Sequence, residues 1–279
     1  MVASVLQPFS ATTAVILVAI GFGVGAFGTL IGAGGGFILT PILLLLYPHD
    51  SPQTLTAISL AAVFFNAASG TAAYARQRRI DYRSGIVFAL ATLPGAVGGA
   101  LVVGHVSRHV FDGIMGGVLA LLAGWLLAAE RWPLPVPQRH LEHREIVDRS
   151  GARYVYDVPL RRGALYSLAV GFLSSFLGIG GGVIHVPLLV GALGFPVHLA
   201  TATSHFVLAV MAGAGTITHL GLGSFAHGHG LRRTAALSAG VVAGAQLGAH
   251  VSLRLRGAVI QWLLAAALLA LAVRLLLAA

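Results

Sequence analysis

Hydrophobic residues occur along most of this chain in long runs that polar residues divide into segments. Most of these segments approach the ~20 residues that an α-helix needs to cross a bilayer, whereas the two that directly follow glycine runs are shorter. The pattern predicts an all-α integral membrane protein with about eight to ten transmembrane segments. The predicted segments are residues 11–31, 35–47, 53–75, 84–104 and 110–130, followed by 163–178, 181–195, 197–221, 231–251 and 257–278.

A glycine-rich motif interrupts both halves of the chain at matching places. The first copy runs from Ile31 to Pro41 and the second from Leu177 to Pro187, at an offset of 146 without a gap. The correspondence continues at an offset of 145, where Gly70-Thr71 matches Gly215-Thr216. Matching over most of the chain indicates an internal duplication. Because short breaks at corresponding positions of two halves are typical of secondary-transporter binding sites, we expect broken or re-entrant helices at both Gly-Gly-Gly motifs.

A polar stretch separates the two hydrophobic halves. It contains Pro133, Pro135 and Pro137 together with many charged residues, a composition typical of a connector outside the membrane. We therefore expect a first transmembrane repeat at residues 1–130, a cytoplasmic connector at 131–162 and a second transmembrane repeat at 163–279.

Arginines between the segments predict the orientation of the first half. The loop of residues 76–83 contains four arginines and shares a side with the connector, and such loops are retained in the cytoplasm. In the second half, Arg232-Arg233 and the pair Arg254 and Arg256 lie in successive loops that must face opposite sides, so counting leaves its orientation open. We expect the halves to be inverted, with their glycine breaks approaching each other near the midplane.

Composition supports a membrane protein. Hydrophobic residues make up 57% of the 279 residues, charged residues only 9%, and the mean hydropathy is +0.89, which is too apolar for a soluble domain of this length. The net charge of +9 comes from arginines between the segments, so nucleic acid is not an expected partner. The absence of cysteine excludes disulfides and thiolate sites. Residues 1–10 lack the basic start of a signal peptide, so we expect a multi-pass protein of the inner (plasma) membrane.

The two glycine runs have the chemistry of an anion site. A helix that begins within such a run leaves its first amide N–H groups without internal partners, and glycine lets a ligand approach the backbone. Helix N-termini attract anions for this reason, by up to ~2 kcal/mol when partly buried. The glycines predicted to bind an anionic substrate are Gly34, Gly35, Gly36, Gly180, Gly181 and Gly182. Alternatively the glycines serve only close helix packing, which the four-residue spacing of Gly240, Gly244 and Gly248 indicates for that series.

Polar side chains inside hydrophobic segments are costly and are therefore further candidates. The hydroxyls predicted to complete the hydrogen bonds to the substrate are those of Thr40, Ser59, Thr203 and Ser204. In the alternative, each hydroxyl bonds a carbonyl one turn earlier in its own helix. Asn66 and Gln246 have no polar counterpart in the other half, and we expect them to bridge helices.

Histidine is the one side chain in the middle of the segments that titrates near neutral pH, because the acidic residues fall at segment ends. His185 and His205 are therefore the predicted sites of proton coupling, and the alternative is a hydrogen bond to a neighbouring helix. Imidazole nitrogens are common ligands of transition metals, and three such side chains lie close together in the sequence, namely His219, His227 and His229. They lie near a loop without a carboxylate, so we expect neither a metal nor a cofactor.

The glycine-proline motifs, the alanine-rich Thr-Ser segment after each and the basic loop 76–83 together resemble the TauE/SafE sulfite exporter family of membrane permeases. The resemblance covers nearly the whole chain except the connector. It implies a transporter of sulfite, sulfonates or related organic anions. The first copy departs from the family at Ala57-Ile58-Ser59, where a threonine usually precedes the serine, as it does in Thr203-Ser204.

We predict a permease, and no enzyme, that exports a small organic or sulfur-containing anion by alternating access. A negative cell interior drives an anion outward by about 2.3 kcal/mol per charge per 100 mV, so export needs no coupling ion. Two alternatives stay open: a membrane assembly or scaffold protein that transports nothing, and a histidine-dependent metal-ion transporter. The expected partners are the anion and the lipid bilayer, and a homo-oligomer is left open.

Overall fold

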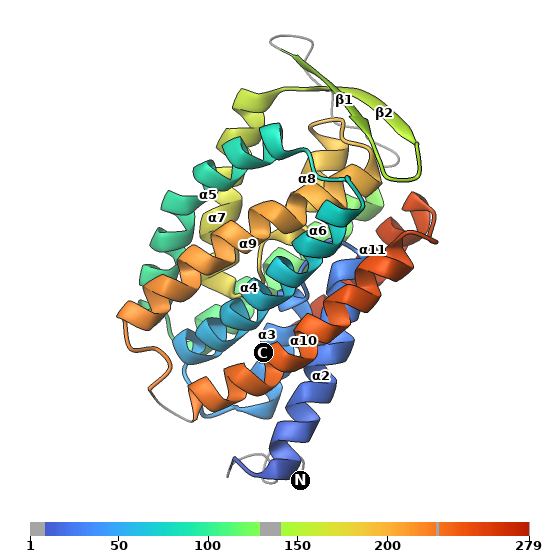
Figure 1. Cartoon of the computed structure of the whole chain (residues 1–279). Helices are drawn as coiled ribbons and strands as arrows, with labels where there is room; N and C mark the ends of the chain where they lie inside the picture. The colour runs from blue at the N-terminus through green and yellow to red at the C-terminus, as the bar shows by residue number, and fades with distance from the viewer. Residues whose placement is uncertain (1–8, 129–140, 227–228, 279) are drawn as a thin grey trace.

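The computed structural model describes residues 9–128, 141–226 and 229–278. Most of these residues are α-helical, and every hydrophobic segment predicted from the sequence contains one helix (Figure 1). The helices are α2 (Ala11–Leu30), α3 (Gly36–Leu46), α4 (Pro52–Arg76), α5 (Tyr82–Val102), η1 (Val103–His105), α6 (Arg108–Ala128), α7 (Leu160–Leu177), α8 (Gly182–Gly191), α9 (Val197–Gly221), α10 (Gly230–Ser252) and α11 (Gly257–Ala278).

Five helices of the described chain are long and apolar enough to cross a membrane, namely α2, α4, α5 together with η1, α9 and α10. The helices that follow the glycine motifs are shorter, with 11 residues in α3 and 10 in α8. Both fall well below the ~20 residues of a full crossing. The membrane-spanning character is thus confirmed, while the total of eight to ten crossings stays a prediction.

Glycines bring two pairs of helices into close contact. A Cβ atom on Gly244 of α10 would lie 2.7 Å from the amide nitrogen of Ala26 in α2. In the same way, a Cβ atom on Gly99 of α5 would lie 2.7 Å from the amide nitrogen of Phe176 in α7. Any side chain at these positions would collide with backbone, so the packing role predicted for the series that contains Gly244 is confirmed.

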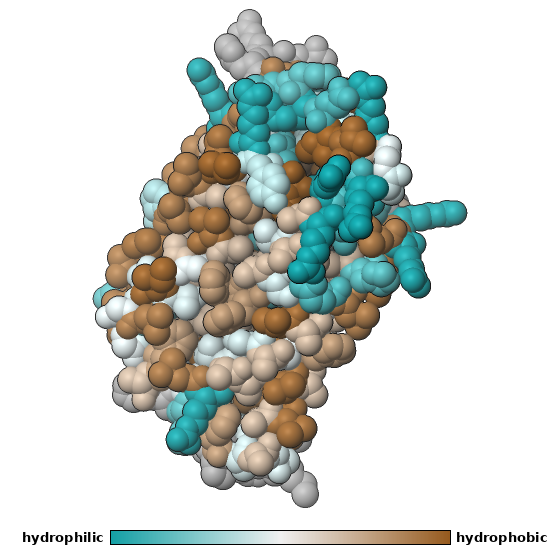
Figure 2. Space-filling view, in the orientation of Figure 1, coloured by the Kyte–Doolittle hydropathy of each residue, from teal (hydrophilic) through white to brown (hydrophobic). Residues whose placement is uncertain are grey.

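The surface and the core both fit a membrane protein. Hydrophobic residues cover the middle of the face shown in Figure 2, and hydrophilic residues gather at the end of the molecule that carries the two strands. In the interior, Ile31 of the first glycine motif and Ile179 of the second are fully buried in one hydrophobic cluster. The interruptions of α2–α3 and α7–α8 therefore lie in the core of the protein.

The connector contains a β-hairpin that the sequence analysis did not anticipate. Strand β1 (Glu142–Val147) pairs antiparallel with β2 (Arg153–Val158), in a register that places Val147 opposite Arg153. The turn closes through a hydrogen bond from the Asp148 amide to the Ala152 carbonyl and through Gly151 at φ +88°. The expectation of an all-α protein is thus corrected to a mostly helical one. Each strand is short, and pairing with the other strand satisfies the hydrogen-bonding groups of its backbone.

Buried charges attach the hairpin to the loop between α4 and α5. Arg79 forms an ion pair with Asp148 over 2.9 Å, and both side chains are almost fully buried. The Tyr156 hydroxyl donates to Asp81 Oδ2 over 2.9 Å, and Arg144 lies 3.5 Å from the same oxygen. Burial and the Asp81 carboxylate raise the pKa of Tyr156, which keeps its hydroxyl available as a donor. We call this end of the molecule, with the hairpin and loop 77–81, the hairpin end.

A second ion pair lies at the opposite end. Arg233 at the start of α10 contacts Asp50 Oδ2 over 2.5 Å, and its guanidinium lies 3.6 Å from the centre of the Tyr47 ring. Arg233 is 4% exposed and therefore paired within the protein. Counting arginines leaves the orientation of the second half open, because the count includes arginines whose charge is neutralised by a carboxylate, as that of Arg233 is by Asp50.

Candidate functional site

The backbone turns left-handed at matching glycines of the two motifs. Gly32, Gly34 and Gly35 have φ values of +79°, +74° and +81°, and Gly178, Gly180 and Gly181 have values of +68°, +77° and +65°. Residues with a Cβ atom rarely adopt this conformation. The six glycines therefore permit the two sharp turns from α2 into α3 and from α7 into α8, which we call the glycine turns (residues 31–36 and 177–182).

The two glycine turns lie in direct contact. A Cβ atom on Gly36 would lie 2.6 Å from the carbonyl carbon and oxygen of Ile179. Conversely, a Cβ atom on Gly182 would lie 2.5 Å from the carbonyl oxygen of Gly32. The structure thus brings together the six glycines that were predicted to bind substrate, although they come from opposite halves of the sequence.

Each glycine turn presents the start of a short helix. Gly35 and Gly181 occupy the N-cap positions, and neither helix start has a side-chain cap. The first amides that bond back to the caps are those of Ile38 in α3 and Ile184 in α8. The amides at the very start of each helix have no partner one turn earlier in the helix. Such groups carry partial positive charge and suit an anion. Two amides of the turns are already occupied, because Gly182 donates to the carbonyl oxygen of Gly180 over 2.7 Å and Gly34 donates to that of Gly28 over 3.1 Å.

Two apolar side chains fill the space between the glycine turns. Val63 of α4 and Leu208 of α9 are each 1% exposed. Both would meet a Cβ atom on Gly34, and both would meet one on Gly180. The neighbouring space beside Gly181 has no room for a water molecule. In this conformation Val63 and Leu208 therefore cover Gly34 and Gly180.

Val63 and Leu208 were missed by the sequence analysis. The offset of 145 that pairs Ser59 with Ser204 also pairs Val63 with Leu208, so the predicted duplication contains a signal for them. The signal is weak, because an apolar residue does not stand out in an apolar segment as a polar one does.

Three of the four predicted hydroxyls lie at the glycine turns. Thr40 and Ser59 both donate to the carbonyl oxygen of Gly178, over 2.8 and 2.7 Å, and Ser204 donates to the carbonyl oxygen of Gly32 over 3.4 Å. Each serine thus bonds to the turn of the opposite half. These contacts differ from the alternative of a bond within the same helix.

Thr203 lies elsewhere. Its hydroxyl accepts a hydrogen bond from the Asp81 amide over 3.0 Å, at the hairpin end. A hydroxyl that points to this loop is directed away from its neighbour Ser204 and from the glycine turns. The structure therefore groups Thr40, Ser59 and Ser204, and separates Thr203 from them.

His205 belongs to a chain of buried hydrogen bonds that ends at the first glycine turn. Its Nε2 atom lies 3.2 Å from the Thr29 hydroxyl, which donates to Asn66 Oδ1 over 3.1 Å. Asn66 in turn donates to the carbonyl oxygen of Gly34 over 2.9 Å. The prediction that Asn66 bridges helices is confirmed, since it joins α4 to residues of α2 and of the glycine turn. Thr29 was not singled out from the sequence, because a lone threonine near a helix end is common.

His185 lies on the other side of the site. Its Nε2 atom lies 3.1 Å from the Ser167 hydroxyl of α7, and its ring meets Phe88 edge to face. Nδ1 is buried without a hydrogen-bond partner. Each histidine thus contacts a neighbouring helix, and their proposed part in proton transfer stays a prediction.

The histidines considered for a metal do not gather in the part of the chain that the structure describes. His219 Nδ1 lies 3.0 Å from the Ser224 hydroxyl, and His229 precedes α10 as its N-cap residue. His227 lies outside the described residues. No group of three or more histidine, aspartate or glutamate side chains forms a metal site among residues 9–128, 141–226 and 229–278.

Long apolar helices around a buried group of backbone and hydroxyl groups define a helical membrane protein. The family model described as "Sulfite exporter TauE/SafE" matches residues 17–275. The chain therefore belongs to the TauE/SafE family, and the resemblance seen in its sequence is confirmed.

Two relatives agree with this assignment. The "Probable membrane transporter protein YunE" of Bacillus subtilis (strain 168) is 32% identical over 213 residues, which cover 74% of this chain and 78% of the relative. A "Probable membrane transporter protein" of Methanocaldococcus jannaschii is 29% identical over 210 residues, which cover 74% of this chain and 72% of the relative. A comparison with solved structures finds no match.

Proposed function

We propose that the protein moves a small organic or sulfur-containing anion, such as sulfite or a sulfonate, across the inner membrane. The observation that carries this proposal is the contact between two helix starts whose N-caps are glycines. Two such starts place several amide donors at one point, and each attracts an anion by up to ~2 kcal/mol when partly buried. The resulting affinity is modest, which suits a carrier that must release its substrate.

The binding groups in this proposal are the amides of Gly34–Gly36 and Gly180–Gly182, of which those of Gly34 and Gly182 must first leave the carbonyl oxygens of Gly28 and Gly180. The hydroxyls of Ser59, Ser204 and Thr40 now bond to carbonyl oxygens of the turns, and they become donors to the anion when the turns separate. The Thr203 hydroxyl is less available to the anion, because it already accepts a hydrogen bond from the Asp81 amide.

The proposed mechanism is alternating access between two inverted halves. Matched contacts support it: a Cβ atom on Gly32 would lie 2.8 Å from the Thr201 Cα atom, and one on Gly178 would lie 2.9 Å from the Thr56 Cα atom. Helix directions support it as well, since α7 starts beside the hairpin whereas α2 runs toward the hairpin end. Val63 and Leu208 must then leave the glycine turns before an anion enters from either side.

Flux measurements in proteoliposomes test the proposal. We expect labelled sulfite and methanesulfonate to cross faster than in empty liposomes. Replacing both serines, Ser59→Ala with Ser204→Ala, should lower the flux about tenfold or more, because two hydrogen bonds of ~1 kcal/mol each are lost. Thr218→Ala is the matched control, since this hydroxyl bonds only the Ala214 carbonyl of its own helix.

Three results would count against the proposal. Flux equal to that of empty liposomes for each anion, with well-folded protein, would leave the scaffold alternative. Flux that the double serine variant does not change would remove the substrate from the glycine turns. An equal loss in the Thr218→Ala control would show that the serines act only through general stability.

A further inference from the structure

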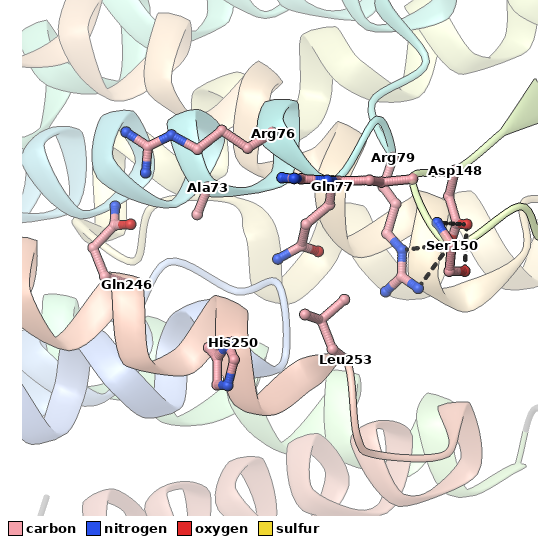
Figure 3. A pocket seen from close by; sticks show the side chains of 10 residues that line it. Ala73, Arg76, Gln77, Arg79, Asp148, Ser150, Gln246, His250 and Leu253 are labelled. Atoms are coloured by element: carbon pink, nitrogen blue, oxygen red, sulfur yellow. Dashed lines mark hydrogen bonds and ion pairs between the residues drawn. The ribbon is translucent and has the colours of Figure 1, made fainter.

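A polar cavity lies at the hairpin end, apart from the glycine turns. It has a volume of about 420 Å³ and is lined by the end of α4, the turn of the hairpin and the last turns of α10 (Figure 3). Arg76 is the last residue of α4 and Gln77 its C-cap, Arg149 comes from the hairpin turn, and Gln246 and His250 come from α10. Three elements that are distant in the sequence thus line one space.

The charge that this cavity offers is positive. Asp148 is the one carboxylate among its lining residues, and it is occupied by Arg79 over 2.9 Å and by the Ser150 amide over 2.8 Å. Burial opposes ionisation of Asp148, but the hydrogen bonds from Ser150 and Arg79 prevail and lower its pKa to about 2. Arg76 and Arg149 form no ion pair within the described residues. Two unpaired guanidinium groups therefore remain.

The cavity is held in shape without a ligand. The Arg149 amide donates to the Gln77 carbonyl over 2.9 Å, which fixes the hairpin turn to the end of α4. Gln77 Nε2 donates to the Ala249 carbonyl over 3.2 Å, and this bond joins α4 to α10. The two arginines thus project from backbone that is already in place, so little order has to be gained on binding.

The flank of the cavity is apolar and exposed. Leu253, the C-cap of α10, lines the cavity and is 41% exposed, and Leu247 and Val242 earlier in α10 have similar exposure. Phe65 of α4 is exposed as well. Exposed apolar residues on membrane-spanning helices face lipid, whereas the arginines mark the depth of the lipid headgroups.

We propose that this cavity binds a phosphate group and that the headgroup of an anionic phospholipid is the source that fits it. Arginine presents paired N–H donors that match phosphate oxygens. The headgroup lies between Arg76 and Arg149, and the acyl chains lie along Leu247 and Leu253. Basic cavities between membrane-spanning helices recognise anionic lipids in this manner. The inference does not depend on the proposed transport function.

Lipid titration of the full-length protein tests this site. The protein is purified in uncharged detergent and titrated with phosphatidylglycerol, with phosphatidylcholine of the same acyl chains, and with inorganic phosphate. Binding is followed by thermal midpoint and by lipid adducts in native mass spectrometry. We expect phosphatidylglycerol to raise the midpoint more than phosphatidylcholine does. The double variant Arg76→Gln with Arg149→Gln should bind it about 30-fold more weakly, at ~1 kcal/mol for each arginine.

Arg161→Gln with Arg162→Gln is the matched control, because it removes the same charge from the same end, outside the cavity. Retained binding in this control with loss in the Arg76 and Arg149 variant supports the proposal. If inorganic phosphate alone gives the arginine-dependent shift, the site holds and its source is free phosphate. Equal losses in both double variants, or no preference for phosphatidylglycerol over phosphatidylcholine in the wild type, would overturn it. Lipid adducts counted on folded protein keep the test valid if a variant is less stable.

Discussion

At the scale of single residues, two separate constraints require glycine in the two turns. Positive φ values make any side chain strained at Gly34, and the Leu208 side chain already occupies the place of its missing Cβ atom. Gly36 differs, because its φ is ordinary and a side chain there is excluded by the backbone of Ile179 and the side chain of Val63. Adjacent glycines of one run are therefore kept for different physical reasons.

Replacement of Gly34 by alanine tests this account. A Cβ atom at this left-handed position costs ~1–2 kcal/mol, and displacement of Leu208 adds a similar amount. We expect the free energy of unfolding to fall by roughly 3 kcal/mol, measured by chemical denaturation in detergent. Gly113→Ala is the control, since nothing lies within 4 Å of its Cβ position in α6. That change should be neutral or slightly stabilising. Equal effects of the two changes would contradict the account.

At the scale of elements, the hairpin shows how a short motif becomes stable through its contacts. An isolated two-stranded hairpin is marginal in water. Here Tyr156 and Val158 of β2 are buried, and they belong to a hydrophobic cluster with Leu193 and Phe195 beyond α8. Arg79 and Asp148 add a buried ion pair. The hairpin thus depends on residues on either side of it in the sequence.

The ion pair predicts a selective effect on the hairpin. Asp148→Asn leaves the buried Arg79 charge without a counterion, which costs about 3–5 kcal/mol. We expect faster hydrogen exchange across residues 142–158, measured by mass spectrometry. Glu145→Gln is the control, because Glu145 pairs with Arg153 on the exposed surface, where a pair contributes ~0–1 kcal/mol. Unchanged exchange in Asp148→Asn would show that the apolar contacts alone hold the hairpin.

The same carboxylate gives a pH dependence. Its pKa is lowered from 3.8 to about 2, so its contribution is present above pH ~4 and is lost as the pH falls toward 2. Pepsin should therefore cleave within residues 142–158 faster at pH 2 than at pH 4, relative to its rate on an unfolded peptide of the same sequence. In Asp148→Asn this extra pH dependence should disappear.

At the scale of the whole molecule, the described conformation is closed around the glycine turns. Val63 and Leu208 come from α4 and α9, which belong to different halves of the chain, and each covers both turns. An anion reaches the amides only if these helices move relative to the turns. Movement between the halves is thus a requirement of the proposed mechanism.

A cross-link between the two halves tests this requirement. The natural chain contains no cysteine, so the double variant Val63→Cys with Leu208→Cys carries the only two thiols. Bridging them by oxidation or with a short dithiol reagent should stop sulfite flux in proteoliposomes, and reduction should restore it. The two single variants, treated in the same way, should keep their flux. Full flux through the bridged protein would show that the halves need not separate at this point.

The amino-acid sequence by itself determined the membrane class, the positions of the helices and the two interruptions. Apolar composition and segment length are properties of each segment alone and do not depend on how the segments pack. Gly34 and Gly180 permit turns with positive φ that other residues rarely adopt. The packing series with Gly244 was readable for the same reason. The family also followed from the sequence, since its motifs are local.

Only the tertiary structure decided which groups meet at the glycine turns. Ser59 and Thr40 bond to Gly178, more than a hundred residues away, and Val63 covers glycines of both halves. Thr203 and Ser204 are neighbours in the sequence, yet Ser204 contacts a glycine turn and Thr203 contacts the hairpin end, because successive helical residues face different directions. The hairpin and the cavity beside it likewise depend on contacts between distant segments. Such contacts follow from how the helices pack, and the order of residues along one helix does not contain them.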